Sequence, residues 1–414
     1  MFLVSKPRRP ASPRTRLQFE SLECREIPAT LAIGGSDGSV RTINPATGAT
    51  IATVRPLDLS ATSKYTGVVA VALGDINADF VPDLFVTAAS PAGVRGLDTS
   101  KAGKVFVYDG AAVANGTLTL IHTYTPFANH FGPGQNGDVD RTGAYTHGLN
   151  IAVSDVNSDG KLDLIAGTRG GQGATGKLEY GRLIVVSTGA AANGSSDTII
   201  GSDNQGLSPF GVRYTKGVVL AAGNLDGTGG DEVAVTRGDA VASSNPNKTV
   251  KLKAFQLRSG TTLTELSLSG SVTPLAPFVS IGSGSNVIDR GADVTFTDQD
   301  GDGKEELIFA ALDRVTNPAN VQVRIAAFSV NTTTGLATAI STGTGPSQSY
   351  LVGTNVVDQA ITSLNLTGTG PKTLALVTES VSSGVAYLTP LSGTVQSGGF
   401  GLNILSGGLT SSGS

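Results

Sequence analysis

The stretch GADVTFTDQDGDGKEELIFAA, residues 291–311, consists of two apolar segments on either side of a polar loop, residues 298–306. Each apolar segment has the length and composition of a buried strand. A short loop rich in Asp and Gly between two such segments is typical of a hairpin. The stretch therefore predicts two antiparallel strands with an acidic loop at their tip.

The same pattern occurs four more times along the chain. The related segments are GVVAVALGDINADFVPDLFVTAA (67–89), GLNIAVSDVNSDGKLDLIAGT (148–168), GVVLAAGNLDGTGGDEVAVTR (217–237) and QAITSLNLTGTGPKTLALVTE (359–379). The five loops, numbered loop 1 to loop 5 in chain order, begin at Asp75, Asp155, Asn224, Asp298 and Asn365. A third apolar strand follows each hairpin, and a weaker fourth strand runs to a junction that contains proline. Four short strands per repeat are the signature of a propeller blade.

The repeats predict an all-β fold, a single β-propeller of four-stranded antiparallel blades. The complete blades are expected at about 58–127, 128–210, 211–278, 279–346 and 347–397. Residues 29–57 contain three strands but no loop of the repeat type, and GGFGLNIL (398–405) is expected to complete this partial blade. Such a closure removes free sheet edges. The preferred count is therefore six blades, with five or seven as alternatives, in a propeller that spans 29–408.

The composition excludes several classes of protein. The single Cys cannot form an internal disulfide. The chain has no apolar run of about 18 residues, the length that a membrane-spanning helix requires. The net charge of −4 argues against a nucleic-acid-binding surface. We therefore expect no membrane span, no nucleic-acid partner and a monomer.

Loop 4, DQDGDGKEE, carries oxygen-bearing side chains at alternating positions. Asp298, Asp300, Asp302 and Glu306 occupy positions 1, 3, 5 and 9 of the loop, and Gly303 occupies position 6. Alternating oxygens in a tight loop converge on one point, because glycine permits the positive φ that turns the chain back. The backbone carbonyl of Lys304 at position 7 can face the same point. Several hard oxygens without His or Cys suit Ca²⁺.

The other loops depart from this pattern to different degrees. The predicted ligands are Asp155, Asn157, Asp159, Lys161 and Asp163 in loop 2, Asp75, Asn77, Asp79, Val81 and Asp83 in loop 1, and Asn224, Asp226, Thr228, Gly230 and Glu232 in loop 3. Calcium is expected in loops 2 and 4. Weaker binding is expected in loop 1, because Phe80 replaces Gly at position 6, and in loop 3, because its charge is lower. Loop 5 has no carboxylate and is expected to bind no metal. The alternative is five polar turns without metal.

The loops are similar to the D-x-[DN]-x-D-G-x-x-[DE] loops of FG-GAP/VCBS repeats, which occur in integrin α-chain-like propellers. The resemblance covers about residues 29–408 and implies a propeller stabilised by calcium.

The N-terminal segment RLQFESLECREIPA (16–29) resembles the short head of exported planctomycete proteins, which implies export or placement at the cell surface. Residues 1–28 lack the apolar h-region of a Sec signal. They are expected to form a basic disordered or targeting head, and residues 409–414 a flexible tail.

The long connections between strands fall on the propeller face opposite the loops. Connections of this length are usually functional, so a protein or glycan partner is expected on that face. The junction 129–148 contains the candidate binding residues His130, Asp138, Asp140, Arg141, Tyr145 and His147, and a solvated polar loop is the alternative. The expected function is a non-enzymatic extracellular or cell-surface binding or adhesion module. The alternatives are a propeller enzyme acting on polysaccharide as a lyase or hydrolase, and a structural surface or matrix component.

Overall fold

The computed structural model describes the chain between residues 30 and 410 with gaps. The described residues are 30–35, 37–44, 49–89, 95–128, 145–169, 171–172, 178–187, 197–202, 206–212, 214–215, 217–238, 241–242, 252–257, 262–266, 269–270, 287–298, 302–314, 321–333, 336–339, 347–353, 356–364, 373–380, 386–396, 399–404 and 409–410. Within them the chain is almost entirely β-structure, with one short helix, α1 (Gly110–Ala114). No helix in this part of the chain is long and apolar enough to cross a membrane.

The first three repeats each form one four-stranded antiparallel blade. Blade 1 has β4 (Val69–Gly74), β5 (Asp83–Ala88), β6 (Val105–Tyr108) and β7 (Leu120–Tyr124) in that order. Blade 2 has β8 (Leu149–Ser154), β9 (Asp163–Thr168), β12 (Leu183–Ser187) and β13 (Thr198–Ile200), and the short pair β10 (Gly171–Gln172) and β11 (Leu178–Glu179) lies between β9 and β12 in the chain. Blade 3 has β14 (Val218–Gly223), β15 (Glu232–Arg237), β17 (Leu252–Leu257) and β18 (Leu263–Leu266).

The last two repeats form blades with additional short strands. Blade 4 is built on β20 (Val287–Thr297), β21 (Glu306–Arg314), β22 (Val321–Asn331) and β23 (Leu336–Ala339), with β24 (Ser347–Gly353) also pairing with β22. The two-residue strands β16 (Val241–Ala242) and β19 (Ser269–Gly270) pair with β20 and β23. Blade 5 has β25 (Val356–Leu364), β26 (Thr373–Ser380), β27 (Ala386–Gln396) and β28 (Gly399–Ile404), with β29 (Leu409–Thr410) also on β27.

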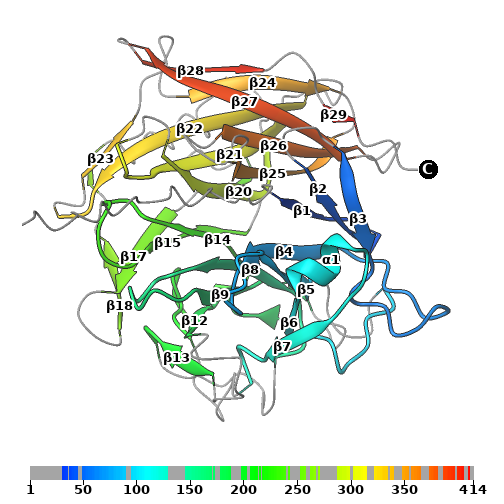
Figure 1. The fold of residues 1–414 in the computed structure, drawn as a ribbon. Coiled ribbons are helices and arrows are strands. Elements are labelled where there is room, and N and C mark those ends of the chain that lie inside the picture. Colours follow the sequence, from blue (N-terminus) through cyan, green and yellow to red (C-terminus); the bar gives the residue numbers. More distant parts are fainter. Residues whose placement is uncertain are drawn as a thin grey trace, which may run out of the picture.

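The blades follow one another around a common centre, with the first strand of each blade innermost (Figure 1). Contacts run between successive inner strands, from β4 to β8, β14, β20 and β25. Apolar side chains fill the space between neighbouring blades. One cluster joins Phe85 and Val107 of blade 1 to Leu149 and Ile184 of blade 2. The all-β propeller of antiparallel blades is thus confirmed.

The blade count differs from the preferred prediction. The arrangement has five blades, one per repeat, which the sequence left as an alternative to six. Residues 30–54 form a separate three-stranded sheet of β1 (Leu31–Gly34), β2 (Val40–Ile43) and β3 (Thr50–Val54). β28 contains most of the GGFGLNIL segment and pairs with β27, not with this sheet. The last repeat takes the C-terminal strand because β27 runs directly into it and a short connection favours pairing between neighbours in the chain.

The N-terminal sheet corresponds to a blade that lacks its inner strand. A Cβ atom on Gly38, just before β2, would clash with the carbonyl of Tyr65, and one on Gly103, just before β6, would clash with the carbonyl of Tyr145. β2 therefore has the same position in the N-terminal sheet that β6 has in blade 1. β1 contacts the inner strand β4 of blade 1, as β15 of blade 3 contacts β20 of blade 4.

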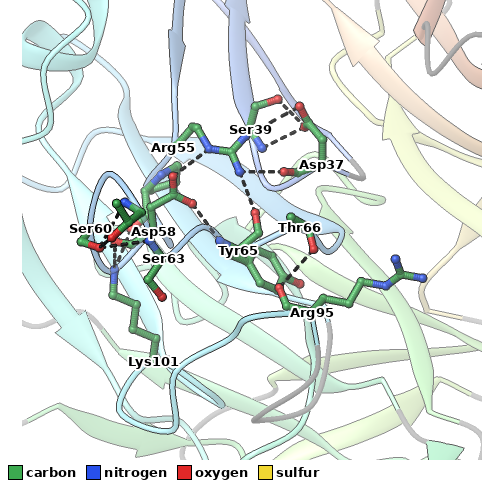
Figure 2. A network of polar contacts seen from close by, with 12 residues as sticks. Asp37, Ser39, Arg55, Asp58, Ser60, Ser63, Tyr65, Thr66, Arg95 and Lys101 are labelled. Atoms are coloured by element: carbon green, nitrogen blue, oxygen red, sulfur yellow. Dashed lines mark hydrogen bonds and ion pairs between the residues drawn. The ribbon is translucent and has the colours of Figure 1, made fainter.

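A polar network fastens this sheet to blade 1 without strand pairing (Figure 2). The Arg55 guanidinium donates to the backbone carbonyls of Asp37 at 2.8 Å and Tyr65 at 2.7 Å. It also donates to the Asp58 carboxylate at 2.8 Å, which in turn accepts the backbone N–H of Tyr65 at 2.9 Å. Lys101, from the β5–β6 connection of blade 1, donates to the carbonyl of Asp58 at 2.8 Å. Hydrogen bonds to charged groups contribute about 1.5–3 kcal/mol each, so the network is a firm attachment.

Candidate metal-binding loops

Loops 1 to 4 connect the first and second strands of blades 1 to 4 and therefore lie at the same end of the propeller. Neighbouring loops contact one another. The backbone N–H of Asp231 in loop 3 donates to the carbonyl of Asp155 in loop 2 at 2.8 Å. The N–H of Glu305 in loop 4 donates to the carbonyl of Asn224 in loop 3 at 2.7 Å. The structure thus brings the predicted ligand loops together in a row. Residues 365–372 of loop 5 lie outside the described residues.

The predicted ligands of loop 2 close a tight turn on the backbone. The two carboxylate oxygens of Asp155 accept the N–H groups of Asp159 at 3.1 Å and Gly160 at 2.9 Å. Asp159 accepts the N–H of Lys161 at 2.9 Å, and the side-chain oxygen of Asn157 accepts the N–H of Asp159 at 2.9 Å. A carboxylate oxygen has two lone pairs, so accepting one N–H leaves capacity for another partner.

Loops 3 and 4 show the same kind of turn. In loop 3, Asp226 accepts the backbone N–H of Thr228 at 2.9 Å. In loop 4, Asp302 accepts the N–H of Lys304 at 2.8 Å, and Asp298 accepts the N–H of Gly303 at 3.1 Å. Asp300, the predicted ligand at position 3, lies outside the described residues.

The loops share two left-handed backbone positions. Position 6 has a positive φ in all four, at Phe80 (65°), Gly160 (78°), Gly229 (73°) and Gly303 (84°). Position 4 has one in loops 1 to 3, at Ala78 (60°), Ser158 (61°) and Gly227 (74°). Phe80 thus keeps the backbone of the repeat at a steric cost of the order of 1–3 kcal/mol. Its side chain is 75 % exposed, so packing offsets little of this strain.

The carboxylates at position 9 are buried at the start of the second strand. Asp83, Asp163 and Glu232 are 0 % exposed, and Glu306 is 4 % exposed. In loops 1 to 3, one oxygen of this carboxylate accepts the backbone N–H of position 2. The donors are Ile76 (3.0 Å), Val156 (3.0 Å) and Leu225 (2.9 Å). Position 9 therefore ties the beginning of each loop to its end.

The second oxygen of position 9 distinguishes loop 1 from loops 2 and 3. In loop 1, Asp83 Oδ1 accepts the N–H of Gly110 at 3.0 Å. Gly110 is the first residue of α1, whose N-cap Asp109 accepts the N–H of Ala112 at 2.7 Å. In loops 2 and 3, Asp163 Oδ1 and Glu232 Oε1 are buried and have no hydrogen-bond partner among the described residues.

Burial shifts the titration of these carboxyl groups. It raises the pKa of Asp163 to about 6, against the hydrogen bonds that the N–H of Val156 and the Ser187 side chain direct to this carboxylate. Burial likewise raises the pKa of Glu232 to about 7, and the charges of Asp226 and Asp231 add to the rise. The pKa of Asp83 is also raised by burial, although the N–H groups of Ile76 and Gly110 oppose the shift. Either protonation or a bound cation stabilises a buried carboxylate whose pKa is raised in this way.

The side chains are not gathered into a finished metal cage. Among the described residues, no three His, Cys, Asp or Glu side chains form a group that could hold a metal ion. In loops 1 and 2 the oxygens at positions 1, 3 and 5 instead accept backbone N–H groups of their own loop. The donor set still fits calcium, because it consists of carboxylate, amide, hydroxyl and carbonyl oxygens, and because Asp163 and Glu232 each contribute a buried oxygen without a partner.

The predicted partner-binding residues on the opposite face are only in part described. His130, Asp138, Asp140 and Arg141 lie outside the described residues. Tyr145 is 3 % exposed, and its hydroxyl donates to the carbonyl of Gly148 at 3.0 Å. His147 packs against the Tyr145 ring, with 5.3 Å between ring centroids. The Tyr145 side chain is therefore part of the core between blades 1 and 2 and is not available to a partner.

A second feature repeats along the chain together with the loops. Tyr65, Tyr145 and Tyr214 each stand ten residues before the start of their loop, and each is followed by Thr. All three are buried, and the hydroxyl groups of Tyr65 and Tyr145 donate to the backbone carbonyl three residues further on. The recurring Tyr-Thr pair was the signal that would have identified these residues as structural.

Comparison with known proteins adds no family. The scan against protein-family models finds no match. The search of curated proteins finds no relative either. The likeness to FG-GAP/VCBS repeats and the likeness of the head to exported proteins therefore rest on the residues themselves and stay predictions.

Proposed function

We propose that this chain is a calcium-stabilised β-propeller that acts as a non-enzymatic binding or adhesion module outside the cell or at its surface. The observation that carries the calcium part is the pair of buried oxygens, Asp163 Oδ1 and Glu232 Oε1, that no group among the described residues satisfies. A buried carboxylate oxygen without a hydrogen-bond partner destabilises the folded state unless a proton or a cation neutralises the group.

Each ion would be held by one loop. The ligands in loop 2 would be the side chains of Asp155, Asn157, Asp159 and Asp163 and the carbonyl of Lys161; in loop 3 those of Asn224, Asp226, Thr228 and Glu232 and the carbonyl of Gly230. Loop 4 would use Asp298, Asp300, Asp302 and Glu306 and the carbonyl of Lys304. Bound calcium would supply positive charge at the buried carboxylate. Calcium would stabilise loop 1 least, because the N–H of Gly110 already donates to the second oxygen of Asp83.

The inner strands of blades 1 to 3 support a binding role rather than catalysis, although β20 and β25 of blades 4 and 5 carry Asp289, Arg290 and Asp358. β4, β8 and β14 consist of Val, Leu, Ile, Ala and Gly, apart from Asn150 and Ser154. The amide of Asn150 donates to the carbonyl of Val218 in the next blade at 2.6 Å, so it joins two blades. A protein or glycan partner would then dock on the face opposite the loops.

Two features support the proposed placement outside the cell. The head 16–29 resembles that of exported proteins. Extracellular calcium modules bind with Kd values of about 10⁻⁴–10⁻³ M, and loops with a mixed set of neutral and charged oxygens suit this range. The role of the ion is then to stabilise the inner strands.

Thermal unfolding in excess chelator and in millimolar calcium tests the proposal, with magnesium as a second cation. We expect calcium to raise Tm, and the double variant Asp163→Asn with Glu232→Gln to lose the part of that response that loops 2 and 3 contribute, while loop 4 keeps its own. Glu265→Ala, which removes an exposed carboxylate on the outer strand β18, should respond like the wild type. A melting curve that calcium leaves unchanged would overturn the calcium assignment.

A further inference from the structure

The contacts between neighbouring loops share one position. Position 8 lies between the predicted carbonyl ligand at position 7 and the buried carboxylate at position 9, and it is Leu162, Asp231 and Glu305 in loops 2, 3 and 4. Its side chain lies against the residue immediately before the preceding loop. A Cβ on Gly74 would clash with Leu162, and a Cβ on Gly223 would clash with the Glu305 carboxylate. The hydroxyl of Ser154 hydrogen-bonds the Asp231 carboxylate.

In loop 4 the residue at position 8, Glu305, forms hydrogen bonds with both the N–H and the carbonyl of Asn224, a predicted ligand in loop 3. The N–H of Glu305 donates to the carbonyl of Asn224 at 2.7 Å. The Glu305 carboxylate accepts the N–H of Asn224 at 2.8 Å. Asn224 is position 1 of loop 3, so its backbone is set by a residue of the next blade. Thr332, also of blade 4, adds a hydrogen bond to the Asp226 carboxylate of loop 3 at 3.0 Å.

Loops 2 and 3 are joined in a corresponding way. The N–H of Asp231 donates to the carbonyl of Asp155, position 1 of loop 2, at 2.8 Å. The approach is close enough that a Cβ on Gly230 would clash with the carbonyl of Val156. In loop 1 position 8 is Pro82, which has no N–H to donate, and no loop of the repeat type precedes loop 1 in the sequence.

We propose that position 8 couples calcium binding in neighbouring loops, so that filling one loop raises the affinity of the loop before it. The proposal rests on the calcium sites proposed above. An ion held by positions 7 and 9 immobilises position 8 between them. Position 8 then holds position 1 of the preceding loop in place, and that loop loses less conformational entropy when it binds its own ion.

The coupling is reciprocal, because the free energy that links two binding sites is the same in both directions. It runs along the row from loop 4 through loop 3 to loop 2. Asp231 and Glu305 are positioning residues in this scheme, since they act through Asp155 and Asn224 and contact no ion themselves. Occupancy of the three loops should therefore rise over a narrower range of calcium concentration than independent sites would allow.

Calcium titration by calorimetry on the full chain tests the coupling. Glu305→Ala should lower the affinity of loop 3 roughly five- to tenfold, at the low end of the usual range of coupling. Glu305→Gln retains an oxygen that can accept the N–H of Asn224 and should keep most of the affinity. In a background where Asp298→Asn and Asp302→Asn empty loop 4, Glu305→Ala should have a much smaller effect on loop 3. Glu265→Ala, with the same change of charge on β18, should leave the titration unchanged.

The outcomes separate this proposal from the one on which it rests. If the wild type binds no calcium, both proposals fail. If the wild type binds calcium and Glu305→Ala leaves every affinity unchanged, the coupling alone fails. Equal losses in Glu305→Ala and Glu305→Gln would also overturn the coupling, because they would assign the effect to charge rather than to the hydrogen bond.

Discussion

Loop 1 and loop 2 have the same backbone conformation but treat their buried carboxylate differently. Asp83 and Asp163 both accept the N–H of position 2, and both are fully buried. The second oxygen of Asp83 accepts the N–H of Gly110 at the start of α1, whereas that of Asp163 has no partner among the described residues. One loop template can thus be completed by a backbone donor or left open to a cation.

The two loops also differ at position 6. Gly160 adopts φ = 78° without steric cost, and a Cβ there would meet no atom within 4 Å. Phe80 adopts φ = 65° and exposes its ring. At position 6, loop 1 therefore carries backbone strain that loop 2 lacks, whereas at position 9 the second oxygen has a donor in loop 1 and none among the described residues in loop 2. Each difference can be altered by a single substitution.

The largest effect is expected for the carboxylate of loop 1. In excess chelator, Asp83→Ala should lower the free energy of unfolding by about 3 kcal/mol, because the N–H groups of Ile76 and Gly110 lose their acceptor at about 1–3 kcal/mol each. Asp163→Ala should cost less, because its two backbone donors, Val156 and Asn157, share one oxygen and the second of these bonds is long at 3.3 Å. The substitution also removes a buried oxygen that has no partner among the described residues. Urea unfolding of both variants measures the difference. Equal losses would show that Gly110 contributes nothing to loop 1.

The pH dependence should be of similar size for each of the two raised carboxyl groups. Because the pKa values of Asp163 and Glu232 are raised in the folded state to about 6 and about 7, protonation favours folding. In chelator this stabilisation is complete below about pH 4 and is lost as the pH rises to about 7, with a change on the order of 3 kcal/mol for each residue. Asp163→Asn should make the free energy of unfolding depend less on pH up to about pH 6, the upper limit of that residue's titration.

Calcium should reverse this trend, since the ion and the proton compete for the same oxygens. In saturating calcium we expect stability to fall as the pH drops from 7 to 4. Urea unfolding across this range, with and without calcium, provides the measurement. Curves of the same slope in both conditions would contradict the binding of calcium by these two carboxylates.

The contribution of bound calcium should differ between the two loops. At ten times its Kd, an ion adds about 1.4 kcal/mol to stability. Asp159→Ala should remove about this amount from loop 2, whereas Asp79→Ala should remove less from loop 1. The difference in Tm between calcium and chelator measures each loss. A larger loss for Asp79→Ala would reverse the assignment of the stronger site.

The smallest effect concerns position 6. Phe80→Gly should stabilise the protein by about 0.5–1 kcal/mol, because relief of strain exceeds the entropy that glycine adds to the unfolded chain. Gly160→Ala should cost about 1 kcal/mol by the converse argument. Chelator is present in both urea titrations, so that metal affinity does not contribute. A destabilised Phe80→Gly variant would mean that the exposed ring has a packing partner.

Most of the architecture could be predicted from the sequence because each blade repeats the same local pattern. The loops, the hairpins and the carboxylate at position 9 follow from residues close together in the chain, whereas the burial of that carboxylate is set by the fold. The blade count could not, because it depends on which strand the segment around Gly399–Ile404 pairs with. The burial of Tyr145 could not be predicted for a similar reason, since it depends on packing between blades.

The sequence by itself determined the loop template, with glycine or a strained substitute at position 6 and a carboxylate at position 9. The tertiary structure decided what completes each loop. Gly110 is 27 residues from Asp83, and Glu305 is 81 residues from the Asn224 that it holds. Buried polar groups must find a partner, and such partners come from whichever strand, helix or blade the fold places beside them.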